Sequence, residues 1–138
     1  MSTNSTSSLS QINLERVVAA NVSIGPHVVT IRNCRLAGRR VRLEFSPWQS
    51  IRVVTDDCIP IGFNVKHTPR NRISTVNESE WVKELQATLK VTDATADFLD
   101  RSMHFYLPVY GALIEIVAWD CKVIAQPKRR RRSSPKAR

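Results

Sequence analysis

The residues with the clearest potential for chemistry lie at the C-terminal end of the chain. Residues 128–138 (KRRRRSSPKAR) contain seven of the 21 Lys and Arg residues and no acidic residue. Like charges at this density repel one another and leave little apolar surface to bury, so the sequence predicts a disordered tail that binds a polyanion. The residues predicted to contact phosphate groups here are Lys128, Arg129, Arg130, Arg131, Arg132, Lys136 and Arg138.

Several functions are compatible with such a tail. It can bind phosphates by counterion release, serve as a nuclear import signal, or do both. Ser133 and Ser134 adjoin the basic run. Phosphorylation would add roughly −1.5 to −2 charges at each and weaken the attraction to a polyanion. The alternative is that the tail has no binding partner and only aids solubility.

A second basic group lies between residues 32 and 72. Arg40 and Arg42 alternate with apolar residues, which predicts a strand with a basic solvent face, and Arg39 begins this run. Trp48 follows in a segment with a proline and could stack on a base, or could instead cover the core. The other basic residues of this region are Arg32, Arg35, Arg52, Lys66, Arg70 and Arg72.

The charge outside the tail is nearly balanced, with 14 basic and 12 acidic residues. The basic excess lies before residue 75, and the acidic excess lies between residues 75 and 127. No apolar stretch approaches the roughly 20 residues of a membrane helix, and the first residues do not resemble a secretion signal. We therefore expect a soluble protein of the nucleus or cytoplasm with no membrane span.

Residues capable of metal binding or catalysis are present but widely spaced. The cysteines and histidines show no close pair of the kind found in zinc sites; they are Cys34, Cys58, Cys121, His27, His67 and His104. Phosphate-binding glycine loops and dinucleotide fingerprints are also missing from the sequence. These observations argue against an enzyme, and we expect neither a metal nor a cofactor.

The elements that would position these residues are mostly strands. We expect an α+β fold: a single compact β-rich domain over residues 12–127, with disordered arms at 1–11 and 128–138. Its sheet would be an antiparallel meander or sandwich- or barrel-like, with one or two helices inserted before the last strands. Strands are expected at residues 17–24, 27–32, 39–45, 50–55, 59–65, 104–107 and 112–125, with a basic loop at 67–75. The long apolar run of the last strand predicts that it is central and buried.

Two helical segments are expected between these strands. Asn77 with Glu80 resembles a capping box, and Thr92 with Asp93 resembles a second helix start. Trp81, Leu85 and Leu89 would line one face of the first helix, either in the core or at a surface for self-association. Residues 109–117 of the last strand are open to the same two interpretations.

Two function classes follow from these features. The leading hypothesis is a non-enzymatic nucleic-acid-binding protein, with RNA favoured over DNA, that uses its basic tail and its basic strands. Its layout is also that of small viral structural or accessory proteins, and it could form homo-oligomers. The alternative is a protein-binding adaptor that its tail directs to an import receptor and that works through the acidic helical side.

Overall fold

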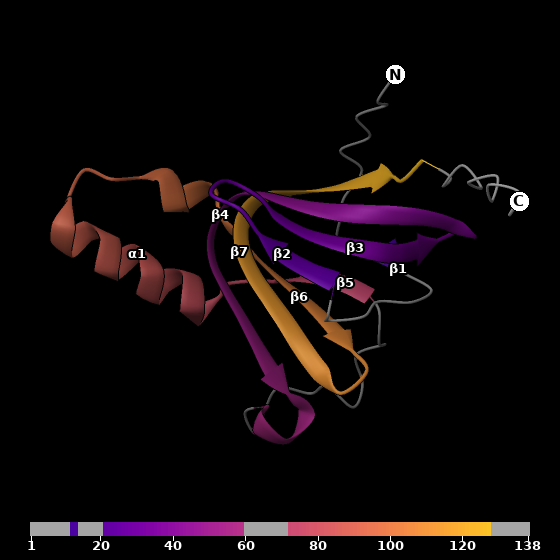
Figure 1. Ribbon diagram of the computed structural model, residues 1–138. Coiled ribbons are helices and arrows are strands. Elements are labelled where there is room, and N and C mark those ends of the chain that lie inside the picture. Colours follow the sequence, from indigo (N-terminus) through magenta and orange to yellow (C-terminus); the bar gives the residue numbers. More distant parts are fainter. Residues whose placement is uncertain (1–11, 14–20, 60–71, 128–138) are drawn as a thin grey trace, which may run out of the picture.

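The computed structural model describes residues 12–13, 21–59 and 72–127 (Figure 1). The two predicted arms lie outside these ranges. Within these ranges lie the α-helix α1 (Glu80–Thr92) and the short 3-10 helices η3 (Asp56–Cys58) and η5 (Phe98–Arg101). The strands are β1 (Ile12–Asn13), β2 (Val22–Ile24), β3 (Val29–Leu36), β4 (Arg39–Thr55), β5 (Arg72–Val76), β6 (Met103–Val109) and β7 (Ala112–Ala125).

The described strands form one antiparallel sheet with the order β1-β5-β6-β7-β4-β3-β2. Strands β2, β3 and β4 form one meander, and β5, β6 and β7 form a second one, with α1 inserted between β5 and β6. The two longest strands, β4 and β7, pair with each other and join the meanders. The expected α+β, β-rich domain is therefore confirmed, as is the central, buried position of the last strand.

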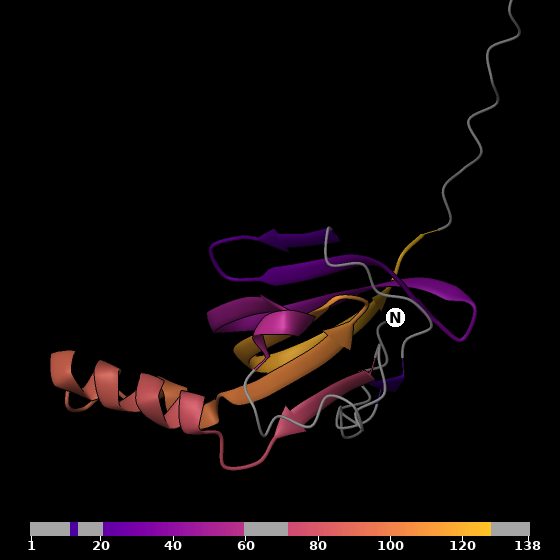
Figure 2. The same ribbon diagram turned by 90° about the horizontal axis from the view of Figure 1, so that it is seen from below.

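One face of the sheet curls around the main hydrophobic core. Figure 2 shows the sheet bending from β2 and β3 through β4 and β7 to β6 and β5. This bend brings Phe45 of β4 against Phe105 of β6, with ring centroids 5.3 Å apart in an edge-to-face arrangement. The curvature therefore lets strands from both meanders bury their apolar side chains in one cluster.

The other face of the sheet packs against α1. Val82 of the helix, Leu99 of η5 and Val117 of β7 form a smaller cluster, onto which Trp81, Leu85 and Leu89 also pack. The apolar side chains of the helix therefore pack in the interior, which was one of the two interpretations of the sequence. Within the described ranges, no helix is long and apolar enough to span a membrane.

The start of the helix differs from the sequence expectation. The N-cap is Ser79, whose Oγ accepts a hydrogen bond from the Val82 backbone N–H at 3.2 Å. Asn77 was the predicted cap, but Glu78 adopts a positive φ of 52° in the turn that follows Asn77, so the helix begins later. The predicted second helix, which was expected to start at Thr92 and Asp93, is also wrong in extent. Asp93 is the C-cap of α1, and only the short 3-10 helix η5 follows before β6.

Three predicted breaks in the strands were misplaced. Pro47 lies within β4 without ending the strand, and the register against β7 shifts two residues later, between Trp48 and Ser50. Pro108 likewise lies within β6, and the turn comes at Tyr110 and Gly111. The part of the predicted basic loop from Arg72 onward is strand β5. Residues 60–71, which hold the rest of that loop and most of the predicted 59–65 strand, lie outside the described ranges.

A tight turn connects β3 and β4. Leu36 pairs with Arg39, so the turn consists of Ala37 and Gly38, and both have positive φ values, 51° and 75°. Two residues with positive φ match the twist of a hairpin, and sequences with Asn followed by Gly favour this turn. Ala37 therefore holds a conformation that is strained for alanine.

We predict that Ala37→Asn raises the free energy of unfolding by up to about 1 kcal/mol, because asparagine tolerates positive φ better than alanine. Ala37→Val is the matched control and should lower it, since β-branched side chains disfavour this conformation. Urea denaturation followed by circular dichroism measures both. A loss of stability in the Asn variant would contradict the assigned turn.

Candidate nucleic-acid interface

Three arginines gather at the hairpin end of β3 and β4. Arg35 pairs with Arg40 across the two strands, and Arg39 follows the turn; all three side chains are exposed. Arg35 reaches this face because β3 has one extra residue between Ile31 and Cys34, where Asn33 has a φ of 59°. The bulge turns Cys34 into the core and Arg35 out to solvent.

These arginines line an open pocket of about 670 Å³ together with the end of β7. The wall opposite the hairpin is formed by Ala125, Gln126 and Pro127, and the Gln126 backbone N–H donates to the Arg40 carbonyl at 2.9 Å. Figure 1 shows the end of β7 beside the β3–β4 hairpin. Because Lys128 follows Pro127 in the chain, the predicted basic tail begins at this pocket.

The charges at this end of the sheet are largely unneutralised. No ion pair within the described ranges involves Arg32, Arg35, Arg39 or Arg40. Arg42 differs, because its Nε donates to Glu44 Oε1 at 2.9 Å on the same strand face. Arg39 and Arg40 are therefore available to an anion, whereas Arg42 is partly neutralised by its neighbour.

Gln126 adds an unusual polar group to the pocket wall. Its side-chain Oε1 is buried and has no hydrogen-bond partner in the structure, and among the described residues it is the only such side-chain atom. A buried acceptor without a donor costs roughly 1–3 kcal/mol. The pocket therefore combines three cationic donors with one unsatisfied acceptor.

Trp48 lies away from this pocket. Its indole Nε1 donates to the Gly25 carbonyl at 2.9 Å, and the ring packs against the main core. Trp48 lies eight positions along β4 from Arg40, which corresponds to roughly 25 Å of extended chain. The structure thus places Trp48 as a cover over the core and does not bring it together with Arg39 and Arg40.

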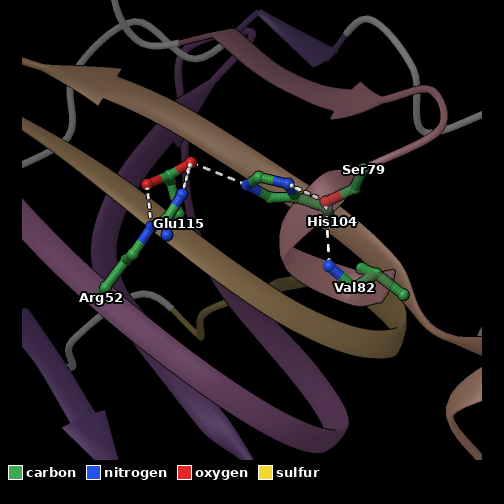
Figure 3. A network of polar contacts seen from close by, with 5 residues as sticks. All are labelled: Arg52, Ser79, Val82, His104 and Glu115. Atoms are coloured by element: carbon green, nitrogen blue, oxygen red, sulfur yellow. Dashed lines mark hydrogen bonds and ion pairs between the residues drawn. The ribbon is translucent and has the colours of Figure 1, made fainter. Parts of the chain in front are cut away.

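Arg52 belongs to a different site, a polar network between β4, β6, β7 and α1 (Figure 3). Its guanidinium makes two hydrogen bonds to the Glu115 carboxylate, through Nε and through Nη2, the latter at 3.1 Å. The same guanidinium lies 4.0 Å from the centre of the Trp81 ring. Arg52 is therefore held by the domain itself, unlike the arginines at the hairpin.

The network continues through His104 to the helix N-terminus. His104 Nε2 lies 2.7 Å from Glu115 Oε1, and His104 Nδ1 lies 2.7 Å from Ser79 Oγ. With neutral His104 protonated on Nε2, Glu115 accepts from His104, Nδ1 accepts from Ser79, and Ser79 accepts from the Val82 N–H. Each of these side-chain polar atoms is then satisfied, as buried networks require.

The Glu115 carboxylate is only 4% exposed, yet it remains ionised. Burial by itself would raise its pKa, but hydrogen bonds from His104 and Arg52, together with the Arg52 charge, outweigh burial and hold the pKa below its ordinary value. The network therefore attaches α1 to the sheet through the ionised Glu115 carboxylate, which His104 and Arg52 stabilise.

A serine, a histidine and a carboxylate in contact also invite comparison with a nucleophilic triad. A second pocket of about 340 Å³ includes Ser79 and His104 in its wall. However, Ser79 is 7% exposed, and its oxygen is already engaged as the helix cap. The Arg52 ion pair further reduces the capacity of Glu115 to stabilise an imidazolium. We therefore interpret the network as a positioning device for α1.

The three cysteines differ in their exposure to solvent. Cys34 and Cys121 are buried and Cys58 is exposed, and all three are free thiols. Burial raises the pKa of the Cys34 thiol to about 11 and raises that of Cys121 further, so both remain protonated at neutral pH. Among the described residues no three His, Cys, Asp or Glu side chains converge on a common point.

Sequence reasoning missed the polar network. It assigned Arg52 to the basic surface and considered His104 only as a metal ligand. One signal was available, because Glu115 is a lone charge within the apolar run 113–117, and a buried charge requires a partner. The identity of that partner depends on strand register, which the sequence does not specify.

The chain has no match among known protein families, curated proteins or solved structures. Its function must therefore be argued from the geometry and the charges of its own residues.

We predict that Glu115→Gln lowers the free energy of unfolding at pH 7 by about 1–2 kcal/mol, because the charge between His104 and half-exposed Arg52 is lost. The folded pKa of Glu115 is lowered, so its stabilisation is complete above the unfolded value and disappears as the pH falls through the folded value. Urea titrations from pH 7 down to acid should show the two proteins converging. A constant difference at every pH would contradict this assignment.

We also predict that Ser79→Ala lowers the free energy of unfolding by about 2–4 kcal/mol, because the helix loses its cap and His104 Nδ1 loses its hydrogen-bond donor. Asn77→Ala is the control, since exposed Asn77 was the cap that the sequence suggested, and it should change stability by less than about 0.5 kcal/mol. Thermal unfolding of both variants tests the assignment. Equal losses in the two variants would refute it.

Proposed function

We propose that the protein binds nucleic acid without catalysing a reaction, with RNA favoured over DNA, and that its basic tail and the arginines at the β3–β4 hairpin contact the phosphate backbone. The observation that carries this proposal is the position of Pro127, the residue that precedes the tail. Pro127 lies in the wall of a pocket lined by Arg35, Arg39 and Arg40. The first basic residue of the tail therefore follows directly on a residue of this pocket.

The charge of these segments supports a polyanion over a single small anion. The tail carries seven cationic side chains, and the hairpin adds exposed arginines that make no ion pair in the described part of the chain. Arginine binds phosphate through two parallel hydrogen bonds and needs no base-specific geometry. A ligand with regularly spaced phosphates can use the tail and the hairpin together.

By analogy of layout alone, a β-rich domain with a basic arm also suits a small viral structural or accessory protein. Such a protein would act on RNA in the nucleus or the cytoplasm, either alone or as a homo-oligomer.

A second candidate function is favoured by the segregation of charge. The exposed acidic residues on and next to α1 are Glu78, Glu80, Glu84, Asp93, Asp97 and Asp100, which lie in elements far from the hairpin in sequence. In this alternative the acidic side binds a protein partner, and the tail binds a nuclear import receptor.

We predict that affinity for single-stranded RNA falls steeply with salt, with a slope of about −4 to −5 in log K against log salt if six or seven phosphates are neutralised. A full-length variant with Arg129, Arg130, Arg131 and Arg132 replaced by Gln should lose about four contacts and flatten the slope accordingly. Fluorescence anisotropy at several salt concentrations measures both quantities.

Two results would refute the binding function: unchanged affinity in the tail variant, or an affinity that does not depend on salt. An adaptor would instead keep its protein partner when the tail is neutralised and would change only its location in the cell. Fluorescence microscopy of the tagged variant, together with the RNA titration, separates the two functions.

A further inference from the structure

The pocket at the β3–β4 hairpin has a composition that a phosphate alone does not explain. Arg35, Arg39 and Arg40 supply cationic donors, and Gln126 supplies a buried acceptor that has no partner in the structure. A ligand that binds both the arginines and the Gln126 side-chain oxygen must carry a negative charge and also a hydrogen-bond donor within reach of the same pocket.

RNA and DNA differ in whether their backbones carry a hydrogen-bond donor. A DNA backbone has phosphate oxygens and a ring oxygen, all of which are acceptors, whereas RNA has a 2′-hydroxyl donor at each sugar. A volume of about 670 Å³ lies in the range of pockets that hold small ligands and leaves room for a sugar beside its phosphate.

We propose that this pocket binds one nucleotide of a single RNA strand, with the phosphate held by the hairpin arginines and the ribose 2′-hydroxyl donating to the Gln126 side-chain carbonyl. The proposal rests on the nucleic-acid binding proposed above and adds a basis for selecting RNA. In the free protein this oxygen is buried. The terminal amide torsion of glutamine has a broad preference, so the amide can turn toward the sugar at little cost.

The backbone of Gln126 favours this arrangement. Its N–H donates to the Arg40 carbonyl, so the residue that would accept from the sugar is tied to one of the arginines that would hold the phosphate. The tail begins two residues later, and a strand bound by the tail is therefore kept at a high local concentration beside the pocket. The tail would supply most of the affinity, and the pocket would supply the discrimination between sugars.

The test uses the full-length protein and two probes: a labelled oligouridylate and the deoxyuridine oligomer of equal length, which differ only in the 2′-hydroxyl. We expect the unmodified protein to favour RNA by about three- to tenfold, the value of one net hydrogen bond. Gln126→Met keeps the length of the side chain without its acceptor, and it should bring RNA affinity down to the DNA value while leaving DNA affinity unchanged.

The arginines are tested with a charge-matched pair of variants. Arg39→Gln with Arg40→Gln should weaken both probes at least about tenfold and reduce the salt slope by about one per lost phosphate contact. The control is Lys83→Gln with Lys90→Gln, which removes the same charge from exposed positions on α1. Circular dichroism confirms that each variant is folded.

Equal affinity of the unmodified protein for the two probes overturns the proposal, as does an RNA preference that persists in the Gln126→Met variant. Equal effects of the arginine and lysine pairs also overturn it, because the pocket would then act only through net charge. None of these results affects the proposed role of the tail, which is refuted if neutralising residues 129–132 leaves binding intact or if binding does not depend on salt.

Discussion

The antiparallel pairing of β4 with β7 is the interaction on which the rest of the structure depends. It joins the two meanders, and its length lets the sheet bend, so that Phe45 and Phe105 meet on one face and Val117 receives the helix on the other. The same ladder places Arg52 directly opposite Glu115, and at its far end it places Ala125 opposite Val41 beside the hairpin. Both the internal polar network and the basic pocket are consequences of this one register.

These two sites use arginine in opposite ways. Arg52 is neutralised by Glu115 and lies over the Trp81 ring, so its charge stabilises the attachment of α1. Arg39 and Arg40 project from a hairpin end where no carboxylate pairs with them in the described part of the chain. The protein therefore separates cations that maintain the fold from cations that are available to a ligand, although both kinds lie on the same strand.

Much of the fold was predictable from local patterns. The alternation of Val41, Leu43 and Phe45 with charged residues and the long apolar run at 112–125 predicted a half-buried and a central strand, and both are present. The helix start was mispredicted because a positive φ at Glu78 moved the cap to Ser79. Site geometry was less predictable: Arg40 was identified from its alternation, whereas its proximity to Gln126 depends on long-range register that no local pattern encodes.

The bulge at Asn33 determines which face each following residue of β3 occupies. Side chains of a strand alternate between the two faces, so regular alternation through Asn33 would turn the Cys34 thiol into water, where oxidants can reach it, and the Arg35 guanidinium into the hydrocarbon interior. The extra residue prevents this exchange, and it depends on a positive φ that asparagine tolerates and β-branched residues disfavour. Natural variants of this protein should consequently hold Asn or Gly at position 33 more often than Val or Ile.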